Sequence, residues 1–186
     1  MNFIAKPREV TKFANDILVQ NIVAHIANPT NHIKIIGAVV DEKISTQIAI
    51  LDTVNRLTNN SILSSKFLLA LLHSKLLNWY VYRFIFAKAI RTMHFDAPVS
   101  DKIPIRAINF ADKIERAAHD KMVALVEQML DAKKHLQTAR TDKDKTYYQD
   151  RCNALDRQID KSVYELYGLT GDKIKLSRAW YNRQAR

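Results

Sequence analysis

The chain has 186 residues, 47% of them hydrophobic, which is enough apolar material to bury a core and excludes an intrinsically disordered protein. Its 29 lysines and arginines outnumber its 19 aspartates and glutamates, and the net charge of +10 favours a polyanionic partner such as nucleic acid. Only three glycines occur, so no glycine-rich loop that cradles phosphate can be assembled.

Short runs rich in β-branched residues predict two strands, at residues 17–24 and 33–40. The segment between them, Asn28-Pro29-Thr30-Asn31, has the composition of a turn. A charged triplet, Asp41-Glu42-Lys43, predicts the next turn, and a third strand is expected near residues 46–54. The N-terminal third is therefore expected to form a small mixed sheet.

A loop at residues 58–61 precedes a long apolar helix, which Ser64 or Ser65 would cap and which ends near Ala89. This segment is long enough for a membrane span, but it contains charged side chains such as Lys75. We therefore expect a helix buried in the core of the protein, and no membrane association.

An aromatic cluster, Trp79-Tyr80-Val81-Tyr82, lies within this helix. Such rings can stack on nucleobases. Because the helix is apolar on most faces, however, we expect the cluster to pack in the core.

Two apolar seams predict a pair of long helices after residue 113. Their members, spaced alternately four and three residues apart, are Ala118, Met122, Leu125, Met129, Ala132 and Leu136 in the first seam, and Tyr148, Cys152, Leu155, Ile159, Ser162 and Leu166 in the second. Thr141 and Asp144 form an N-terminal capping pattern between the helices, which are expected to make an antiparallel hairpin. Gly168 suits the position after the second helix, and a last short helix is expected from Thr170 to Trp180.

Several spaced motifs follow one another along nearly the whole chain. They are Lys6-Pro7-Arg8-Glu9, Leu71-Leu72-His73-Ser74-Lys75-Leu76-Leu77-Asn78-Trp79-Tyr80, Lys88-Ala89-Ile90-Arg91-Thr92, Lys102-Ile103-Pro104-Ile105 and Val163-Tyr164-Glu165-Leu166-Tyr167-Gly168-Leu169-Thr170. In this combination the chain resembles the TaqI-like C-terminal specificity domain, which is the target-recognition domain of type II restriction-modification adenine-specific DNA methyltransferases.

The resemblance implies that the chain reads a DNA sequence while the methyltransferase or nuclease portion of the same enzyme carries out catalysis. By the same resemblance, the parent enzyme uses S-adenosylmethionine to methylate adenine and, where it also cleaves DNA, Mg²⁺. No cofactor site or catalytic residue is carried over to this chain. We therefore expect it not to be an enzyme by itself, and to be either an excised part or a free specificity subunit.

Together these features predict an α+β fold, in which a small mixed-sheet target-recognition domain with a buried helix is followed by a long antiparallel helical hairpin. The recognition region is expected at residues 1–112, the hairpin at 113–168 as a spacer or docking element, and a short basic helix or tail at 169–186. The alternative is a protein-interaction module, in which the hairpin forms a homodimer and the basic loops are incidental.

The positive charge is unevenly distributed along the chain. Residues 61–110 carry 7 basic and 2 acidic side chains, whereas residues 111–171 carry 11 of each. Because arginine, lysine and threonine can contact guanine edges or phosphates, and asparagine can pair with adenine, we expect two groups of residues to bind double-stranded DNA. The first group is Asn28, Thr30, Asn31, His32 and Lys34, and the second is Lys88, Arg91, Thr92, His94, Lys102 and Arg106. An ordinary turn and a solvated basic loop are the respective alternatives.

Two patterns are similar to catalytic motifs but have simpler explanations. The segment Asn28-Pro29-Thr30-Asn31 lacks the second proline and the tyrosine of the methyltransferase motif Asn-Pro-Pro-Tyr, so we interpret it as a turn. The triplet Asp41-Glu42-Lys43 has the acid-x-Lys spacing of a metal-dependent nuclease, yet no acidic residue lies between Asp16 and Asp41. No histidine has a paired metal-ligand spacing, so no metal site is expected.

The single cysteine, Cys152, excludes an intrachain disulfide, and the first residues lack the pattern of a signal peptide. Both features fit a protein of the reducing cytoplasm.

Overall fold

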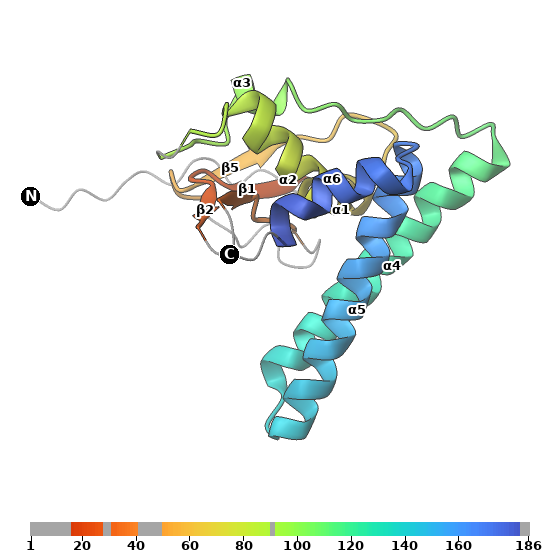
Figure 1. Ribbon diagram of the computed structural model, residues 1–186. Coiled ribbons are helices and arrows are strands. Elements are labelled where there is room, and N and C mark those ends of the chain that lie inside the picture. Colours follow the sequence, from red (N-terminus) through yellow and green to blue (C-terminus); the bar gives the residue numbers. More distant parts are fainter. Residues whose placement is uncertain (1–15, 28–30, 41–49, 90–91, 183–186) are drawn as a thin grey trace, which may run out of the picture.

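The computed structural model of the chain describes residues 16–27, 31–40, 50–89 and 92–182 (Figure 1). Within these ranges the elements are β1 (Ile17–Gln20), β2 (Ala24–Ile26), β3 (His32–Lys34), β4 (Gly37–Val39), β5 (Val54–Leu57), α1 (Ser65–His73), α2 (Lys75–Tyr80), the π-helix η1 (Val81–Ile85), α3 (Ala97–Ser100), α4 (Lys113–Thr138), α5 (Asp142–Leu166) and α6 (Gly171–Asn182). The predicted α+β class is confirmed, because small sheets pack with helices and α4 and α5 form a hairpin (Figure 1).

Each of the two predicted N-terminal strands divides in two, and the halves enter different sheets. β1 lies between β4 and β5, and β2 pairs with β3. These pairings are all antiparallel, where a mixed sheet was expected. The division after β1 has a physical cause, since the Asn21 carbonyl accepts from the Phe95 N–H at 2.7 Å. The Val23 N–H donates to the Met93 carbonyl at 2.9 Å, so the segment around residue 94 takes the place of a strand partner.

The first half of the third predicted strand, residues 46–49, lies outside the described residues, and residues 50–53 are not a strand. β5 starts at Val54, where the expected strand ends, and a turn closed by the Val54 N–H and the Leu51 carbonyl at 3.0 Å leads into it. The predicted turn at Asp41-Glu42-Lys43 lies outside the described residues. The segment Ile103-Pro104-Ile105 is part of the connector between α3 and α4, and the Tyr167 hydroxyl fastens it by donating to the Pro104 carbonyl at 2.6 Å.

The central apolar helix is broken at Ser74, although the sequence predicts one helix to residue 89. Ser64 caps α1, as predicted. The Ser74 hydroxyl donates to the Leu71 carbonyl at 2.7 Å and accepts from the Leu77 N–H at 3.2 Å, so one side chain ends α1 and caps α2. Serine competes with the helical backbone for these hydrogen bonds, which apolar periodicity does not reveal.

The buried amide of Asn78 joins the broken helix to the strands. Its Oδ1 accepts from the Ile35 N–H at 2.7 Å, and its Nδ2 donates to the carbonyls of Leu72 (2.9 Å) and Ser74 (2.8 Å). Ile35 follows β3, so this one side chain fixes both the helix break and the position of the sheet beside it. Without this amide the buried Ile35 N–H would lose its acceptor, whereas the Ser74 carbonyl would still accept from the backbone N–H of residue 78 at 3.1 Å.

A second link between helix and sheet comes from His73. The Gly37 N–H donates to His73 Nε2 at 3.0 Å, which requires a neutral ring with its proton on Nδ1. Desolvation and then the positive charge of Lys34 lower the pKa of His73, so the ring stays neutral and keeps this acceptor.

The start of α2 also anchors the hairpin. Asp160 on α5 is buried, and its carboxylate accepts from the Lys75 backbone N–H at 2.9 Å and from Lys75 Nζ at 2.7 Å. A carboxylate at the first turn of a helix also interacts favourably with the helix dipole. Burial alone would lower the pKa of Lys75, but the hydrogen bond and charge of Asp160 outweigh it, and the pKa is raised.

The hairpin follows the predicted seams with one exception. Thr141 caps α5 through the Asp144 N–H at 3.1 Å, and Gly168 has the left-handed φ of 61° expected after its last turn. Ala118, however, is exposed, and His119 is buried in its place. The reason is that the first part of α4 packs against α1 as well as α5, which rotates the buried stripe by one residue.

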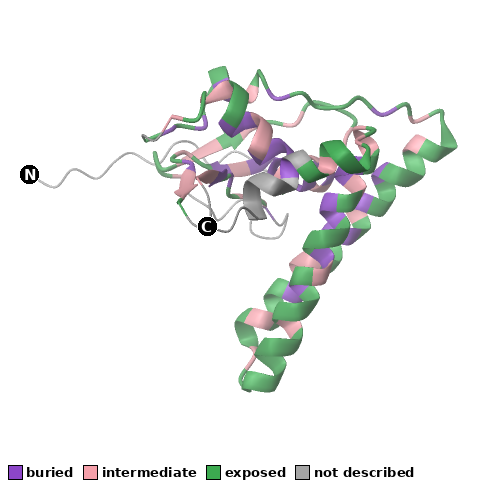
Figure 2. Ribbon diagram, viewed as in Figure 1, coloured by how far each residue is buried: buried purple, intermediate pink, exposed green. Residues whose placement is uncertain are grey.

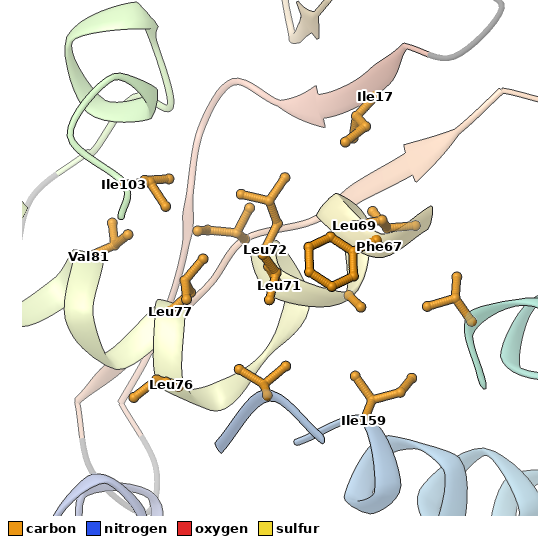
Figure 3. Packing of buried hydrophobic residues seen from close by; sticks show 14 of the residues in the cluster. Ile17, Phe67, Leu69, Leu71, Leu72, Leu76, Leu77, Val81, Ile103 and Ile159 are labelled. Atoms are coloured by element: carbon orange, nitrogen blue, oxygen red, sulfur yellow. The ribbon is translucent and has the colours of Figure 1, made fainter. Parts of the chain in front are cut away.

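Burial divides the hairpin into two halves. Where α4 and α5 meet α1 and α2, their inward side chains are buried, whereas the far half is exposed on most sides and stands away from the sheets (Figure 2). In the core, the side chains of α1 and α2 lie between Ile17 of β1 and Ile159 of α5 (Figure 3). The near half of the hairpin therefore shares the hydrophobic core of the strands.

We predict that Asn78→Ala destabilises the protein by about 2–5 kcal/mol, because it leaves the buried Ile35 N–H without its acceptor and removes the side-chain donor to the carbonyls of Leu72 and Ser74. Chemical denaturation followed by circular dichroism measures this loss. Asn153→Ala is the matched control, since Asn153 lies on the exposed face of α5 and should change the free energy of unfolding by less than about 0.5 kcal/mol. Equal effects of the two substitutions would contradict the role given to Asn78.

The two carboxylates near Lys75 are expected to contribute unequally. Asp160 is 3% exposed and lies 2.7 Å from Lys75 Nζ, whereas the Asp156 side chain is 58% exposed and lies 3.6 Å away. Asp160→Ala should cost about 2–4 kcal/mol of unfolding free energy, and Asp156→Ala less than about 1 kcal/mol. If urea denaturation gave equal losses, the buried bonds to Lys75 would not be what fastens the hairpin.

Candidate nucleic-acid interface

The first predicted group of DNA contacts is described only in part. Asn28 and Thr30 lie outside the described residues, whereas Asn31 and His32 are half-buried and Lys34 is exposed. His32 and Lys34 both belong to β3, where residues two apart point to the same side of the sheet. The hairpin of β2 and β3 therefore presents these two side chains together.

Three members of the second group line one hollow. Thr92, His94 and Lys102 surround a cavity of about 400 Å³, together with Asp96 and apolar residues from η1 and α3. The segment after η1 carries Thr92 and His94, and Lys102 follows α3. Asp96 also caps α3, since its Oδ1 accepts from the Val99 N–H at 3.3 Å. Residues up to ten apart in sequence thus meet at one place.

The hydrogen bonds around His94 determine which of its ring nitrogens carries the proton. Asn21 Nδ2 donates to the Asp52 carbonyl at 3.2 Å, which orients the amide and leaves Oδ1 as an acceptor. His94 Nδ1 lies 3.2 Å from that oxygen and must therefore carry the proton. In the neutral ring Nε2 is then an acceptor, and such a nitrogen can pair with the exocyclic amino group of cytosine or adenine.

Much of the basic charge predicted to face DNA is neutralised within the protein. The pairs with hairpin carboxylates are Lys66 with Glu127 (2.6 Å), Lys75 with Asp160 (2.7 Å) and Arg106 with Glu115 (2.9 Å). Arg106, one of the predicted contacts, is therefore held at the start of α4. Of the basic residues described between 61 and 110, those with no described carboxylate in ion-pair distance are Arg83, Lys88 and Lys102.

Lys88 is held in an unusual backbone conformation. It has a φ of 60°, Ala87 before it has a φ of 50°, and both lie in the left-handed region that non-glycine residues seldom adopt. The Lys88 N–H donates to the Tyr82 carbonyl at 2.9 Å, and the Tyr82 hydroxyl donates to the Lys88 carbonyl at 3.3 Å. These two bonds stabilise the sharp turn that ends the π-helix, and they fix the backbone position of Lys88 in that turn. Arg91, predicted beside it, lies outside the described residues.

The aromatic cluster is only partly buried. Val81 and Tyr82 belong to the core as expected, but Trp79 and Tyr80 are half-buried and Phe84 is 58% exposed. The cause is the π-helix, whose wider turn is closed by the Phe86 N–H and the Val81 carbonyl at 2.9 Å. An added residue in the turn rotates Phe84 away from the position that α-helical spacing predicts. Sequence periodicity assumes α-helical geometry and so could not find this exposed ring.

The histidine and carboxylate positions give no sign of a metal centre. Among the described residues, no group of three or more His, Cys, Asp or Glu side chains is placed to hold a metal ion. His119 instead packs between Phe67 and Phe110, with Nε2 accepting from the Ser64 N–H at 3.2 Å. The triplet Asp41-Glu42-Lys43 lies outside the described residues. In the described part of the chain, no helix has the length and apolar character that crossing a membrane requires.

No family model, no curated protein and no solved structure matches this chain. The likeness to a TaqI-like specificity domain therefore rests on the sequence motifs named above, and the function must be argued from those motifs together with the hollow and its charges.

Proposed function

We propose that the chain is a sequence-specific DNA recognition domain of a type II restriction-modification enzyme or adenine-specific DNA methyltransferase, with catalysis supplied by the methyltransferase or nuclease portion. The observation that carries the proposal is the convergence of Thr92, His94 and Lys102 on one hollow. These residues were selected from the sequence for their ability to contact DNA, and the fold brings them together from two segments.

The hollow offers both kinds of contact that DNA recognition needs. The Lys102 ammonium and the Thr92 hydroxyl are donors for phosphate oxygens, which position a protein on the duplex. His94 Nε2 is an acceptor for a base amino group, which carries sequence information. Asp96 on the rim could likewise accept from cytosine N4. A hollow that combined only lysines would bind without discrimination.

The hairpin has the form of a docking element in this proposal. Its near half is fixed by Asp160 and by the shared core, so it cannot swing freely against the recognition region. Its far half stands away from the sheets and is available to the catalytic portion (Figure 1). The alternative of a dimer through the apolar seam is less favoured, because α4 and α5 already fill that seam with each other.

We predict that Lys102→Gln weakens binding to every duplex sequence alike and lowers the slope of log affinity against log salt by about 1, because one phosphate contact is lost. Fluorescence anisotropy of a labelled duplex at several salt concentrations measures both effects. Arg106→Gln is the matched control, since Glu115 already neutralises that guanidinium and the slope should stay nearly unchanged.

Two outcomes would overturn this proposal. One is that the whole chain fails to bind duplex DNA even at low salt. The other is that Lys102→Gln and Arg106→Gln reduce affinity and slope equally, which would mean that total charge, not the hollow, determines binding.

A further inference from the structure

We propose that the partly exposed rings of Trp79, Tyr80 and Phe84, with Arg83 beside them, form a stacking site for an unpaired nucleobase. This site extends duplex recognition to a base that is single-stranded or turned out of the helix. It lies on α2 and η1 and does not include Thr92, His94 or Lys102, the residues of the hollow that we propose contact DNA.

The first step of the argument is the geometry of the rings. Phe84 lies 5.5 Å from Trp79 in an edge-on arrangement of 80°, and 5.2 Å from Tyr80 at 42°, measured between ring centroids. At these angles neither Trp79 nor Tyr80 is stacked parallel on the Phe84 ring. With 58% of its surface exposed, Phe84 can offer a face to a planar ligand.

The second step is electrostatic. No aspartate or glutamate occurs between Asp52 and Asp96, so the helices that carry the cluster contain no carboxylate to repel a phosphate backbone. The Arg83 guanidinium lies 5.9 Å over the Trp79 ring, and Lys88 follows on the turn that ends η1. Neither has an ion-pair partner among the described residues. Aromatic faces beside unpaired cations are the combination that binds single-stranded nucleic acid.

A membrane surface is the less favoured ligand for the same residues. Insertion into lipid gains free energy in proportion to the apolar area that leaves water. Trp79 and Tyr80 are half-buried in the protein, so Phe84 is the only one of the three rings that exposes more than half of its surface. Stacking requires only one ring face, and the cluster provides it.

The experiment compares a single strand of thymidines, about 12 nucleotides long, with an abasic strand of the same length and charge. Binding of the whole chain is followed by anisotropy of a dye on the oligonucleotide. Since the strands differ only in their bases, we expect the thymidine strand to bind at least about 10-fold more tightly. Equal affinities for the two strands would contradict the proposal.

The variants test whether the Phe84 ring is responsible. Phe84→Leu should lower affinity for the thymidine strand by about 5- to 100-fold and leave the abasic strand unchanged, whereas Phe84→Tyr should retain binding. Ile62→Ala, at an 80% exposed position elsewhere, controls for loss of apolar surface and should change neither. Retention of thymidine binding in Phe84→Leu would overturn the proposal, because leucine keeps the apolar bulk without the aromatic face.

The test separates this site from the hollow and from lipid. If Lys102→Gln leaves duplex binding unchanged while Phe84→Leu weakens the thymidine strand, the proposed function fails and the stacking site stands. If Phe84→Leu instead abolishes co-sedimentation with phosphatidylserine vesicles and does not affect the thymidine strand, the cluster is a membrane contact and the inference is wrong.

Discussion

The break in the central helix at Ser74 and Asn78 is the constraint on which the rest of the structure depends. In an unbroken helix the backbone N–H groups at this point would bond within the helix and would not be free for the hairpin. The Asn78 side chain would also lack the turn that places it against the Ile35 N–H. Three hydrogen bonds form around the break. The Asn78 amide binds the Ile35 N–H, and the His73 ring binds the Gly37 N–H. The Lys75 N–H, at the start of α2, binds the Asp160 carboxylate. Because those three partners lie beside the strands or on the hairpin, a few residues set the position of both against the core.

The same anchoring determines where positive charge remains for a ligand. The hairpin is charge-balanced in sequence, but its carboxylates Glu115, Glu127 and Asp160 form ion pairs with basic residues of the segment 61–110. The ion pairs that hold the hairpin therefore neutralise part of the positive charge that the sequence concentrates in residues 61–110. What remains is gathered on the turn after η1 and around the hollow, and a ligand that needs cations would be directed to that side of the molecule.

The architecture was predictable where a pattern repeats over many residues, as in the hairpin seams and the cap at Thr141. The break in the helix was less predictable, because single side-chain hydrogen bonds determine it. Ser74 and Asn78 both fit the pattern of an apolar helix until their tertiary partners are known. The exposed ring of Phe84 was missed because a π-helical turn changes the angular spacing of side chains. For the site, the sequence singled out Thr92, His94 and Lys102 by their chemistry, but only the fold shows that they line one hollow. The ion pair of Arg106 with Glu115 likewise depends on a contact that no local pattern encodes. Whether the three residues bind DNA stays a prediction.

Selection of this chain against a randomised duplex library, carried out at two salt concentrations, tests the central claim of sequence-specific DNA recognition most directly. The account predicts that retained duplexes share a defined motif and that retention falls steeply as salt increases, because base contacts and phosphate contacts act together. Failure to retain any duplex at low salt, or retention with no enriched motif, would contradict the claim that this chain reads a DNA sequence.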